Sequence, residues 1–508
     1  MRARDLAAAS IRASSSAWPG EYAVARCSAE ARLTASRKAA TTFASRWRIV
    51  GPTVCSYSFS RALANAAANV DAPLLIEGEM LERLRWLATT LPFRAIVACL
   101  ILKGHLLAFE KLARERFDVE TFEVEHASEP RFLRDTDYVP VDWARLIVSR
   151  WDAQHYIELG LRGYEKCKSK TELGPDEYPD DEKRCQLNFF PTYGFIGAWV
   201  AARLGWGIDY GLFAVSLVSS FILIMLWTSR VITSVVGVGT TYLALLLFNT
   251  FTTGFVLVTV QTEPIFLMLT MATYYCFARR WLLAAALAAG ASTAIRITGV
   301  PIGMAYSAAL LLLTLRERPP RWVWGVRALY GVLSVSGVVI LMAYFQHRFG
   351  DALIYAHAHG RQYHHQASIA PILHPDTRLI MQSIWGEPND GVWLAAGLLW
   401  FGLGHRKALE RFDAPSQVFL YVLYVGVVGV AMVGSADYAY GGISRYLLGA
   451  IPLFFAMAAL LRNRPIVLGI WLYISIAHYW GGSLCYYVGP SEGVRIERCG
   501  YARHFTSN

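Results

Sequence analysis

Charge is scarce in this chain of 508 residues. Asp, Glu, Lys and Arg together make up 17% of it, whereas a typical soluble domain has about 25%. Hydrophobic residues make up 55%, and many apolar runs approach the length that crosses a membrane. This composition excludes an ordinary soluble globular protein and predicts an all-α polytopic membrane protein.

Signals for nucleic-acid, metal and redox chemistry are also lacking. The net charge of +10 comes largely from Arg and Lys in short loops and in the N-terminal segment. Membrane orientation explains such an excess, so we expect no nucleic-acid partner. The eight cysteines form no CxxC pair and HExxH does not occur, so we expect no metal and no cofactor. Two cysteine pairs could form disulfides in an oxidising compartment, Cys167 with Cys185 and Cys485 with Cys499.

The hydropathy pattern divides the chain into five parts. The first part, residues 1–90, is rich in Arg, Ser and Ala and lacks the apolar core of a secretory signal. We therefore predict a disordered extension there, or a start codon placed too far upstream. The parts are the extension at 1–90, a first span at 91–109, an external loop at 110–188, a multi-span domain at 189–486 and a tail at 487–508.

The apolar runs also predict how often the chain crosses the membrane. One crossing needs about 20 helical residues, so we expect about 11 to 13 spans. The pieces at 231–262 are short for two full crossings, and a re-entrant hairpin is the alternative there.

Basic loops predict the topology, because Lys and Arg concentrate on the cytosolic side. The basic loops lie at 279–280, 316–321, 405–411 and 462–464. Counting spans from these loops places other polar segments on the outer or luminal side, at 110–188, 261–263, 346–388 and 435–445.

The external loop carries a compact polar cluster. Asp152, His155 and Tyr156 share one face if this segment is helical, since residues three and four apart are neighbours on a helix. Arg150 and Trp151 precede them. A carboxylate beside an imidazole suits acid-base chemistry or substrate binding. The alternative is an interfacial amphipathic helix with a snorkelling arginine.

Further charged candidates stand at the ends of apolar runs. Glu263 heads one run, where a helix dipole favours a carboxylate and where a second acidic group could orient an acceptor. Arg296 and Arg445 could each bind an anionic group or snorkel to lipid headgroups. Asp351 precedes a His-rich loop, which we expect to be a polar surface segment rather than a metal site.

Polar and aromatic candidates complete the set. Asn188 and Tyr193 flank paired phenylalanines and a proline at the start of the second span. An interfacial aromatic belt is the alternative to a binding site there. Tyr446 follows Arg445 directly and is a further substrate-binding candidate.

A series of short motifs occurs in a fixed order along the chain. They are Arg150-Trp151-Asp152-x-x-His155-Tyr156, Asn188-Phe189-Phe190-Pro191-x-Tyr193, Thr262-Glu263-x-x-Phe266, Arg296-x-Thr298-Gly299, Phe349-Gly350-Asp351 and Arg445-Tyr446-Leu447-Leu448. In this order they resemble the PIG-V-type mannosyltransferases, the family of glycosylphosphatidylinositol mannosyltransferase 2 and its bacterial relatives. The resemblance covers residues 90–465, and its first two motifs are the most specific.

The resemblance implies a C-type glycosyltransferase fold whose first external loop carries interfacial helices. It also implies a polyprenyl-phosphate sugar donor such as dolichyl-phosphate mannose, a lipid-linked or glycolipid acceptor, and inversion at the anomeric carbon. Asp152 would then be the general base, with His155 orienting it or the acceptor and Glu263 as a second acidic group. Arg296 and Arg445 would hold the lipid phosphate. Expected partners are these two substrates, membrane lipids and a small membrane subunit.

Other functions and locations stay open from the sequence. A transporter or lipid flippase is the main alternative, although no internal repeat of the kind common in transporters occurs. A non-catalytic lipid-binding scaffold is another. The outward loops contain no Asn-x-Ser/Thr, and several motifs depart from the eukaryotic pattern. We therefore favour a bacterial plasma membrane, with the endoplasmic reticulum and GPI-anchor synthesis as the alternative.

Overall fold

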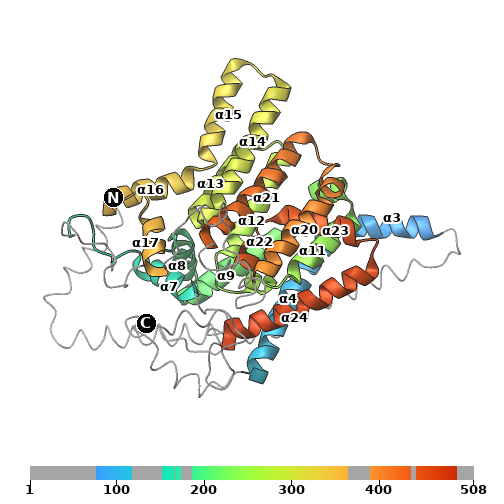
Figure 1. Ribbon diagram of the computed structural model, residues 1–508, viewed down its shortest axis with the longest axis horizontal. Coiled ribbons are helices and arrows are strands. Elements are labelled where there is room, and N and C mark those ends of the chain that lie inside the picture. The colour runs from blue at the N-terminus through green and yellow to red at the C-terminus, as the bar shows by residue number, and fades with distance from the viewer. Residues whose placement is uncertain are drawn as a thin grey trace. The chain divides into compact units, whose positions relative to one another are not determined.

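A computed structural model describes residues 76–116, 152–165, 167–172, 186–363, 390–435 and 442–488. Within these ranges the chain forms helices and turns and contains no β-strand, which confirms the predicted all-α class (Figure 1). The helices around the site belong to the larger of two compact units, and the smaller unit includes Arg203–Trp206.

The described part of the chain begins with two helices in sequence, α3 (Ile76–Ala88) and α4 (Leu91–Arg116). The helix α3 lies inside the N-terminal extension predicted at 1–90. Residues 1–75 lie outside the described ranges, so the nature of this extension stays a prediction. The helix α4 begins where the first span was predicted and continues past its expected end. Two shorter helices follow, α7 (Asp152–Arg162) and α8 (Thr192–Leu204).

A bent and partly irregular region follows α9 (Ile208–Trp227). The helices α10 (Arg230–Val236) and α11 (Val238–Asn249) meet at an angle of 110°. The chain then runs through the 3₁₀ turn η1 (Gly254–Val258) to α12 (Glu263–Ala278). Every residue from 251 to 263 is buried. Irregular backbone in a membrane protein is tolerated where protein surrounds it. A broken span and a re-entrant hairpin both fit this geometry, so the hairpin stays a prediction.

The remaining helices follow α12 in the chain, and several of them pack directly against it. In order they are α13 (Leu282–Ile295), η2 (Ile297–Gly299), α14 (Val300–Glu317), α15 (Arg321–Leu333), α16 (Ser336–Phe349), α17 (Ile354–Tyr363), α20 (Asp390–Leu409), α21 (Ala414–Ser435), α22 (Ile443–Leu447), α23 (Ile451–Leu461) and α24 (Pro465–Val488). In Figure 1 the hairpin of α14 and α15 stands at the top, and α4 runs beside α24 at the bottom right.

Long apolar helices are consistent with a multi-pass membrane protein. Among the described residues, four helices are long and apolar enough to cross a membrane, and the number rises to six if each bent pair is one span. The bent pairs are α10 with α11 and α15 with α16, the latter bent by 58°. Shorter apolar helices add to these at Leu282–Ile295, Ile451–Leu461 and Pro465–Trp480. The higher span count expected from the sequence stays a prediction.

The two ends of the α12–α14 region differ in character. Arg280, just after α12, pairs with Glu317 at 3.7 Å and with Asp413 at 3.6 Å. These contacts join two of the predicted cytosolic loops, 279–280 and 316–321, and bring Asp413, which follows the loop at 405–411, to the same end. Glu263 stands at the other end of α12, about 24 Å away for a helix of 16 residues.

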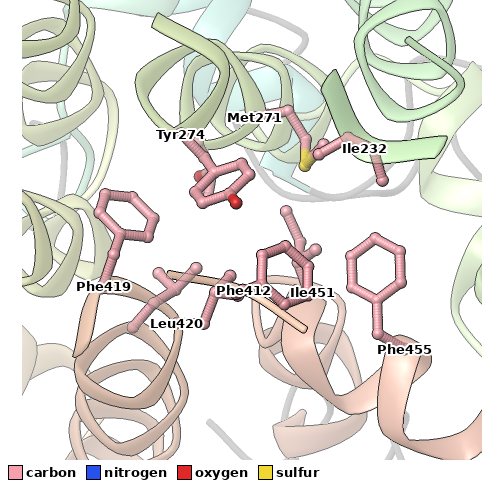
Figure 2. Close-up of a pocket in the computed structure, with 10 residues that line it drawn as sticks. Ile232, Met271, Tyr274, Phe412, Phe419, Leu420, Ile451 and Phe455 are labelled. Carbon is pink, nitrogen blue, oxygen red and sulfur yellow. The ribbon is translucent and has the colours of Figure 1, made fainter. Parts of the chain in front are cut away.

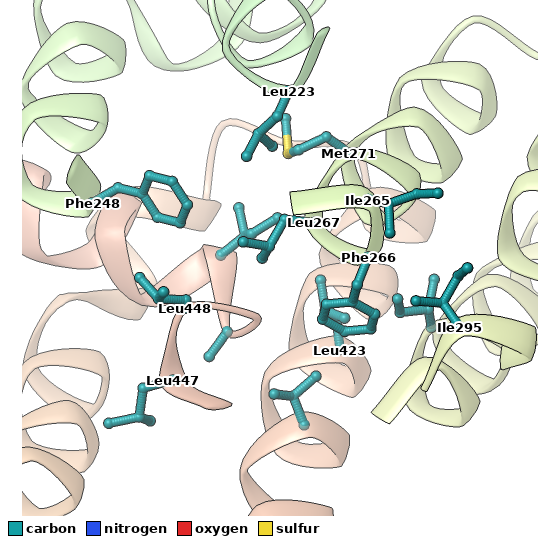
Figure 3. Close-up of a cluster of buried hydrophobic side chains, with 14 of the residues drawn as sticks. Leu223, Phe248, Ile265, Phe266, Leu267, Met271, Ile295, Leu423, Leu447 and Leu448 are labelled. Carbon is teal, nitrogen blue, oxygen red and sulfur yellow. The ribbon is translucent and has the colours of Figure 1, made fainter. Parts of the chain in front are cut away.

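Buried apolar side chains hold the segments that carry charged residues (Figure 3). Ile265, Phe266 and Leu267 follow Glu263 in α12 and are nearly or fully buried. Ile295 immediately precedes Arg296, and Leu447 lies two residues after Arg445. Apolar side chains in such a core are close-packed and resist displacement. Each charged residue is therefore anchored by neighbours in its own sequence.

Candidate functional site

Two arginines and two carboxylates meet where four separate parts of the chain converge. Nη1 of Arg445 lies 2.8 Å from Oδ2 of Asp152. Nε of Arg445 donates to Oε1 of Glu263, and its Nη2 donates to Oε2 at 3.2 Å. Arg296 donates from Nη1 to the same Glu263 Oε1. We call these four residues the charge cluster.

Glu263 is the buried centre of the charge cluster. Its side chain is 2% exposed and it stands in the first turn of α12. The positive end of the helix dipole favours a carboxylate there, and Pro264 fits the first turn because its missing N–H has no role in it. A buried carboxylate is costly without partners, and the two arginines supply them. Glu263 therefore positions both guanidinium groups.

Arg296 is presented by a tight turn between α13 and α14. The helix α13 ends because Arg296 adopts an extended backbone, with φ −152° and ψ 153°. At Gly299 a Cβ atom would collide with the carbonyl of Ser292, so the turn needs glycine. The Arg296 guanidinium carbon lies 5.2 Å from the ring centroid of Tyr446, a cation–π distance. The predicted residues Arg296 and Tyr446 are thus brought together.

Arg445 is presented by the short helix α22. Gly442 precedes this helix with φ +77°, a conformation that favours glycine. Oγ1 of Thr253 donates to the carbonyl of Ser444 at 3.1 Å, which ties the irregular segment to α22. Oε1 of Gln261 accepts from Nη2 of Arg445 at 2.6 Å. Glu263 and Gln261 therefore hold Nε and Nη2 of Arg445.

The segment from Asp152 onward is helical, as predicted, so Asp152, His155 and Tyr156 lie on one side of α7. The Asp152 side chain is 30% exposed, which makes it the more accessible carboxylate of the charge cluster. His155 contacts Oε1 of Gln186 through Nδ1 and stacks on Phe189 with 4.2 Å between ring centroids. Tyr156 places its hydroxyl 3.5 Å from Oγ1 of Thr262. The α7 face therefore borders the start of α12.

Burial sets the protonation of the α7 side chains. It lowers the pKa of His155, and the charge of Asp152 and the Gln186 hydrogen bond oppose that shift. Burial raises the pKa of Tyr156 well above its usual value of about 10. Both side chains are therefore neutral near pH 7, and neither adds a charge to the charge cluster.

Other predicted site residues make different contacts. Tyr193 is fully buried and its hydroxyl donates to the Leu212 carbonyl at 3.0 Å. Asn188 is buried beside Phe189 in the chain. Asp351 accepts from the backbone N–H of Leu353 at 2.9 Å, and its Oδ2 lies 2.6 Å from Nδ1 of His357. Asp351 thus lies in the turn that precedes α17, and a role in binding stays a prediction for all three.

Several predictions fall on residues that the structure does not describe. Arg150 and Trp151 lie outside the described ranges, as do Cys185 and Cys499. Cys167 takes part in a disulfide bond. The side chain of Cys485 is not described. The partner of Cys167 and the second predicted disulfide therefore stay predictions.

Gln261 is the site residue that sequence reasoning missed. It is fully buried, and its main-chain carbonyl accepts from Oγ of Ser216 at 3.4 Å. Its position two residues before Glu263, in a polar interruption between apolar runs, was the available signal. Because it holds Arg445 from the side opposite Asp152, it belongs with the charge cluster.

A separate apolar pocket lies farther along α12 (Figure 2). Met271 and Tyr274 line it from α12, with Phe419 from α21 and Phe455 from α23. These α12 residues are two to three turns beyond Glu263, at about 3.6 residues per turn. An apolar lining does not suit a phosphate or a sugar. This pocket is therefore distinct from the charge cluster.

Comparison with known proteins does not assign the chain to a family. No family model matches it, and no curated protein matches it at a significant level. The function must therefore be argued from the charge cluster and its surroundings.

Proposed function

We propose that this protein is a membrane glycosyltransferase, specifically a mannosyltransferase. It would move a hexose from a polyprenyl-phosphate donor to a lipid-linked or glycolipid acceptor, with inversion, on the outer or luminal face. The motif resemblance to the PIG-V-type family motivates the donor and the sugar. A bacterial plasma membrane is the favoured location, and GPI-anchor mannosylation applies if the host membrane is the endoplasmic reticulum.

One observation carries the proposal. A partly exposed carboxylate, Asp152, lies 2.8 Å from Arg445, and Arg296 shares Glu263 with that arginine. A glycosyl transfer from a lipid phosphate needs a base for the acceptor hydroxyl and cations for the leaving phosphate. The charge cluster combines both within one small region. A nucleotide-sugar enzyme would instead need groups that recognise a nucleotide.

The proposed step balances within the charge cluster. The acceptor hydroxyl oxygen forms a bond to the anomeric carbon as the bond from that carbon to the phosphate oxygen breaks. The bonding electron pair leaves with the phosphate, whose charge Arg445 and Arg296 neutralise. The hydroxyl proton passes to Asp152. Guanidinium groups suit the leaving group because they remain charged and can bind two oxygens at once.

His155 and Glu263 have supporting roles in this proposal. Burial keeps His155 neutral, and its contact with Gln186 fixes its ring. It can therefore donate to or accept from the acceptor but does not add a charge beside Asp152. Glu263 is 2% exposed and occupied by both arginines, so it orients the phosphate-binding groups and does not receive the proton.

The test is a transfer assay with purified protein, labelled polyprenyl-phosphate mannose and a panel of lipid acceptors. Asp152→Asn should lower the transfer rate by at least about a hundredfold, because general-base catalysis contributes about 10²- to 10⁴-fold. It should leave insertion and folding intact, since this side chain is 30% exposed.

Asp413→Asn is the matched control. Asp413 also pairs with an arginine, Arg280, but at the other end of α12. Its activity should equal that of the unchanged protein. Full transfer activity in Asp152→Asn would remove Asp152 from the mechanism, and transfer from a nucleotide sugar instead would refute the proposed donor.

A transporter or lipid flippase is the second candidate, favoured by the breaks in the helices. Irregular segments at 250–262, 296–299 and 448–450 converge near buried charges, and transporters bind substrates at such breaks. The distinguishing measurement is lipid or solute movement across vesicles containing the purified protein. Movement without any transfer product would favour this candidate over the transferase.

A further inference from the structure

The two sides of the Arg445 guanidinium are occupied in different ways. On the inner side, Nε and Nη2 meet Glu263 and Gln261, which are 2% and 0% exposed. On the outer side, Nη1 meets Asp152, which is 30% exposed. A ligand that approaches from the exposed side reaches the Asp152 contact first. The inner contacts fix the guanidinium while the outer contact is open to exchange.

The contacts of Arg445 also differ in strength, because their burial differs. Exposed ion pairs contribute little net free energy, because water screens them and competes for both groups. Removing a partner from a buried charge is costly, because the remaining charge has no water to replace it. An arriving anion therefore displaces Asp152 from Arg445 more readily than it displaces Glu263.

We infer that the Asp152–Arg445 ion pair is a gate, in which the phosphate of a polyprenyl phosphate replaces Asp152 on Nη1 of Arg445 and thereby releases the Asp152 carboxylate. This inference rests on the proposed function for the identity of the ligand. Before the exchange, Arg445 holds Oδ2 of Asp152 and keeps this carboxylate turned towards the guanidinium. After it, the phosphate holds Arg445 and Asp152 faces the acceptor.

The gate imposes an order on binding. The phosphate-bearing donor should arrive first, because Asp152 can turn towards an acceptor hydroxyl only after the phosphate has replaced it on Arg445. Arg296 supports the exchange from within the charge cluster, since its contact with Glu263 persists when Asp152 moves away. The total charge of the four groups is zero before binding, so the phosphate competes directly with a carboxylate rather than filling an uncompensated positive site.

The gate predicts an unusual phenotype for Asp152→Asn, a gain in phosphate affinity together with loss of transfer. An amide binds a guanidinium less strongly than a carboxylate and does not repel a phosphate. The affinity for a short-chain polyprenyl phosphate in detergent should rise by about fivefold, the scale of one exposed ion pair. The affinity for the corresponding polyprenol, which lacks the phosphate, should not change.

Titration calorimetry with the purified proteins measures both affinities. Asp413→Asn provides the control, because it removes a carboxylate from another exposed Asp–Arg pair. Arg445→Gln should lose the preference for the phosphate over the alcohol. Asp152→Ser serves as a second variant if Asp152→Asn does not fold, since serine also suits the first residues of a helix. Inorganic phosphate distinguishes a headgroup effect from one that requires the lipid chain.

The outcomes separate the gate from the proposed function. A polyprenyl-phosphate affinity in both Asp152 variants that equals or falls below that of the unchanged protein overturns the gate. If the affinity rises but the unchanged protein transfers no sugar in any assay, the gate stands and the transferase proposal fails. If transfer occurs and no rise is seen, Asp152 remains the base and the gate alone is refuted.

Discussion

At the residue scale, two carboxylates with the same chemistry differ in how deeply they are buried. Asp152 and Glu263 both contact Arg445, but their side chains are 30% and 2% exposed. Water can replace the partner of the first carboxylate and cannot reach the second. Loss of Asp152 should therefore affect chemistry more than stability, whereas loss of Glu263 should affect both.

Glu263→Gln should lower the free energy of unfolding by about 3 kcal/mol, because it removes a buried carboxylate and leaves the partly buried guanidinium groups of Arg296 and Arg445 without it. Thermal or denaturant unfolding in detergent measures the change. Glu317→Gln is the control, since Glu317 also contacts two arginines but is 41% exposed. Equal stability of the two variants would contradict the structural role assigned to Glu263.

His155 should make the stability depend on pH. Its pKa is lowered by burial, so the unfolded chain binds a proton more readily than the folded protein does. Its contribution is therefore complete above about pH 6.5, the usual histidine pKa, and declines as pH falls toward the lower folded pKa.

The free energy of unfolding should fall between about pH 7 and about pH 5 by less than 1.4 kcal/mol per pH unit, the limit for one proton. His155→Gln should reduce this slope. A slope identical in the unchanged protein and His155→Gln would refute the assignment.

The sequence predicted individual charged residues better than their partners. Asp152, Glu263, Arg296 and Arg445 stood out because polar groups are rare beside apolar runs. Their convergence could not be read from spacing, because Glu263 lies 33 residues from Arg296 and 182 from Arg445. Gln261 was missed because a neutral amide is ordinary in a sequence, and only its burial against Arg445 makes it notable.

At the element scale, interruptions of helices place the charged groups. Arg296 stands between α13 and α14, Glu263 begins α12, and Arg445 lies in the short helix α22. A continuous helix satisfies its own backbone, whereas each interruption needs partners from other elements. The breaks are therefore stabilised by tertiary packing. A substitution that disturbs a close contact between helices near a break should lower the stability of the protein.

Gly290→Ala should destabilise the protein by about 1 to 3 kcal/mol, the usual cost of overpacking. A Cβ at Gly290 in α13 would collide with the Leu333 carbonyl and lie 2.8 Å from Oγ of Ser336. Gly325→Ala is the control, because Gly325 lies in α15 with open space around it. Unfolding in detergent measures both, and equal stability would show that α13 can move without cost.

Hydropathy predicted the uninterrupted helices well. The sequence has apolar runs at 210–228 and 415–434, and the structure has α9 (Ile208–Trp227) and α21 (Ala414–Ser435) at these places. It did not predict the 58° bend between α15 and α16, since no proline stands there and apolar character continues through it. The apolar run at 251–262 proved irregular, because average hydropathy does not distinguish a buried turn from a buried helix.

At the scale of the whole molecule, a polar network joins helices from both ends of the described chain. His105 of α4 lies 2.6 Å from the hydroxyl of Tyr479 in α24 and 3.2 Å from Oδ1 of Asn249 in α11. Nδ2 of Asn249 donates to the Leu245 carbonyl, so Oδ1 is the acceptor for His105. We therefore assign the proton to Nε2 of His105, with Tyr479 donating to Nδ1.

Tyr479→Phe should lower the free energy of unfolding by about 1 to 2 kcal/mol, because Nδ1 of the buried His105 loses its donor. The phenyl ring keeps the edge contact with Phe255. Tyr473→Phe, on the same helix at a position 75% exposed, should have little effect. Thermal unfolding in detergent compares them, and similar losses in both would argue against the network.

The long separation of Arg445 from Glu263 has a consequence for how the protein is made. Arg296 emerges from the ribosome 33 residues after Glu263, and Arg445 emerges 182 residues after it. At a synthesis rate of about 5 to 20 residues per second, Arg445 is therefore added about 10 to 40 s after Glu263. During synthesis this carboxylate therefore enters the assembling helices with half of its final charge compensation, and completion of α22 is the event that closes the cluster.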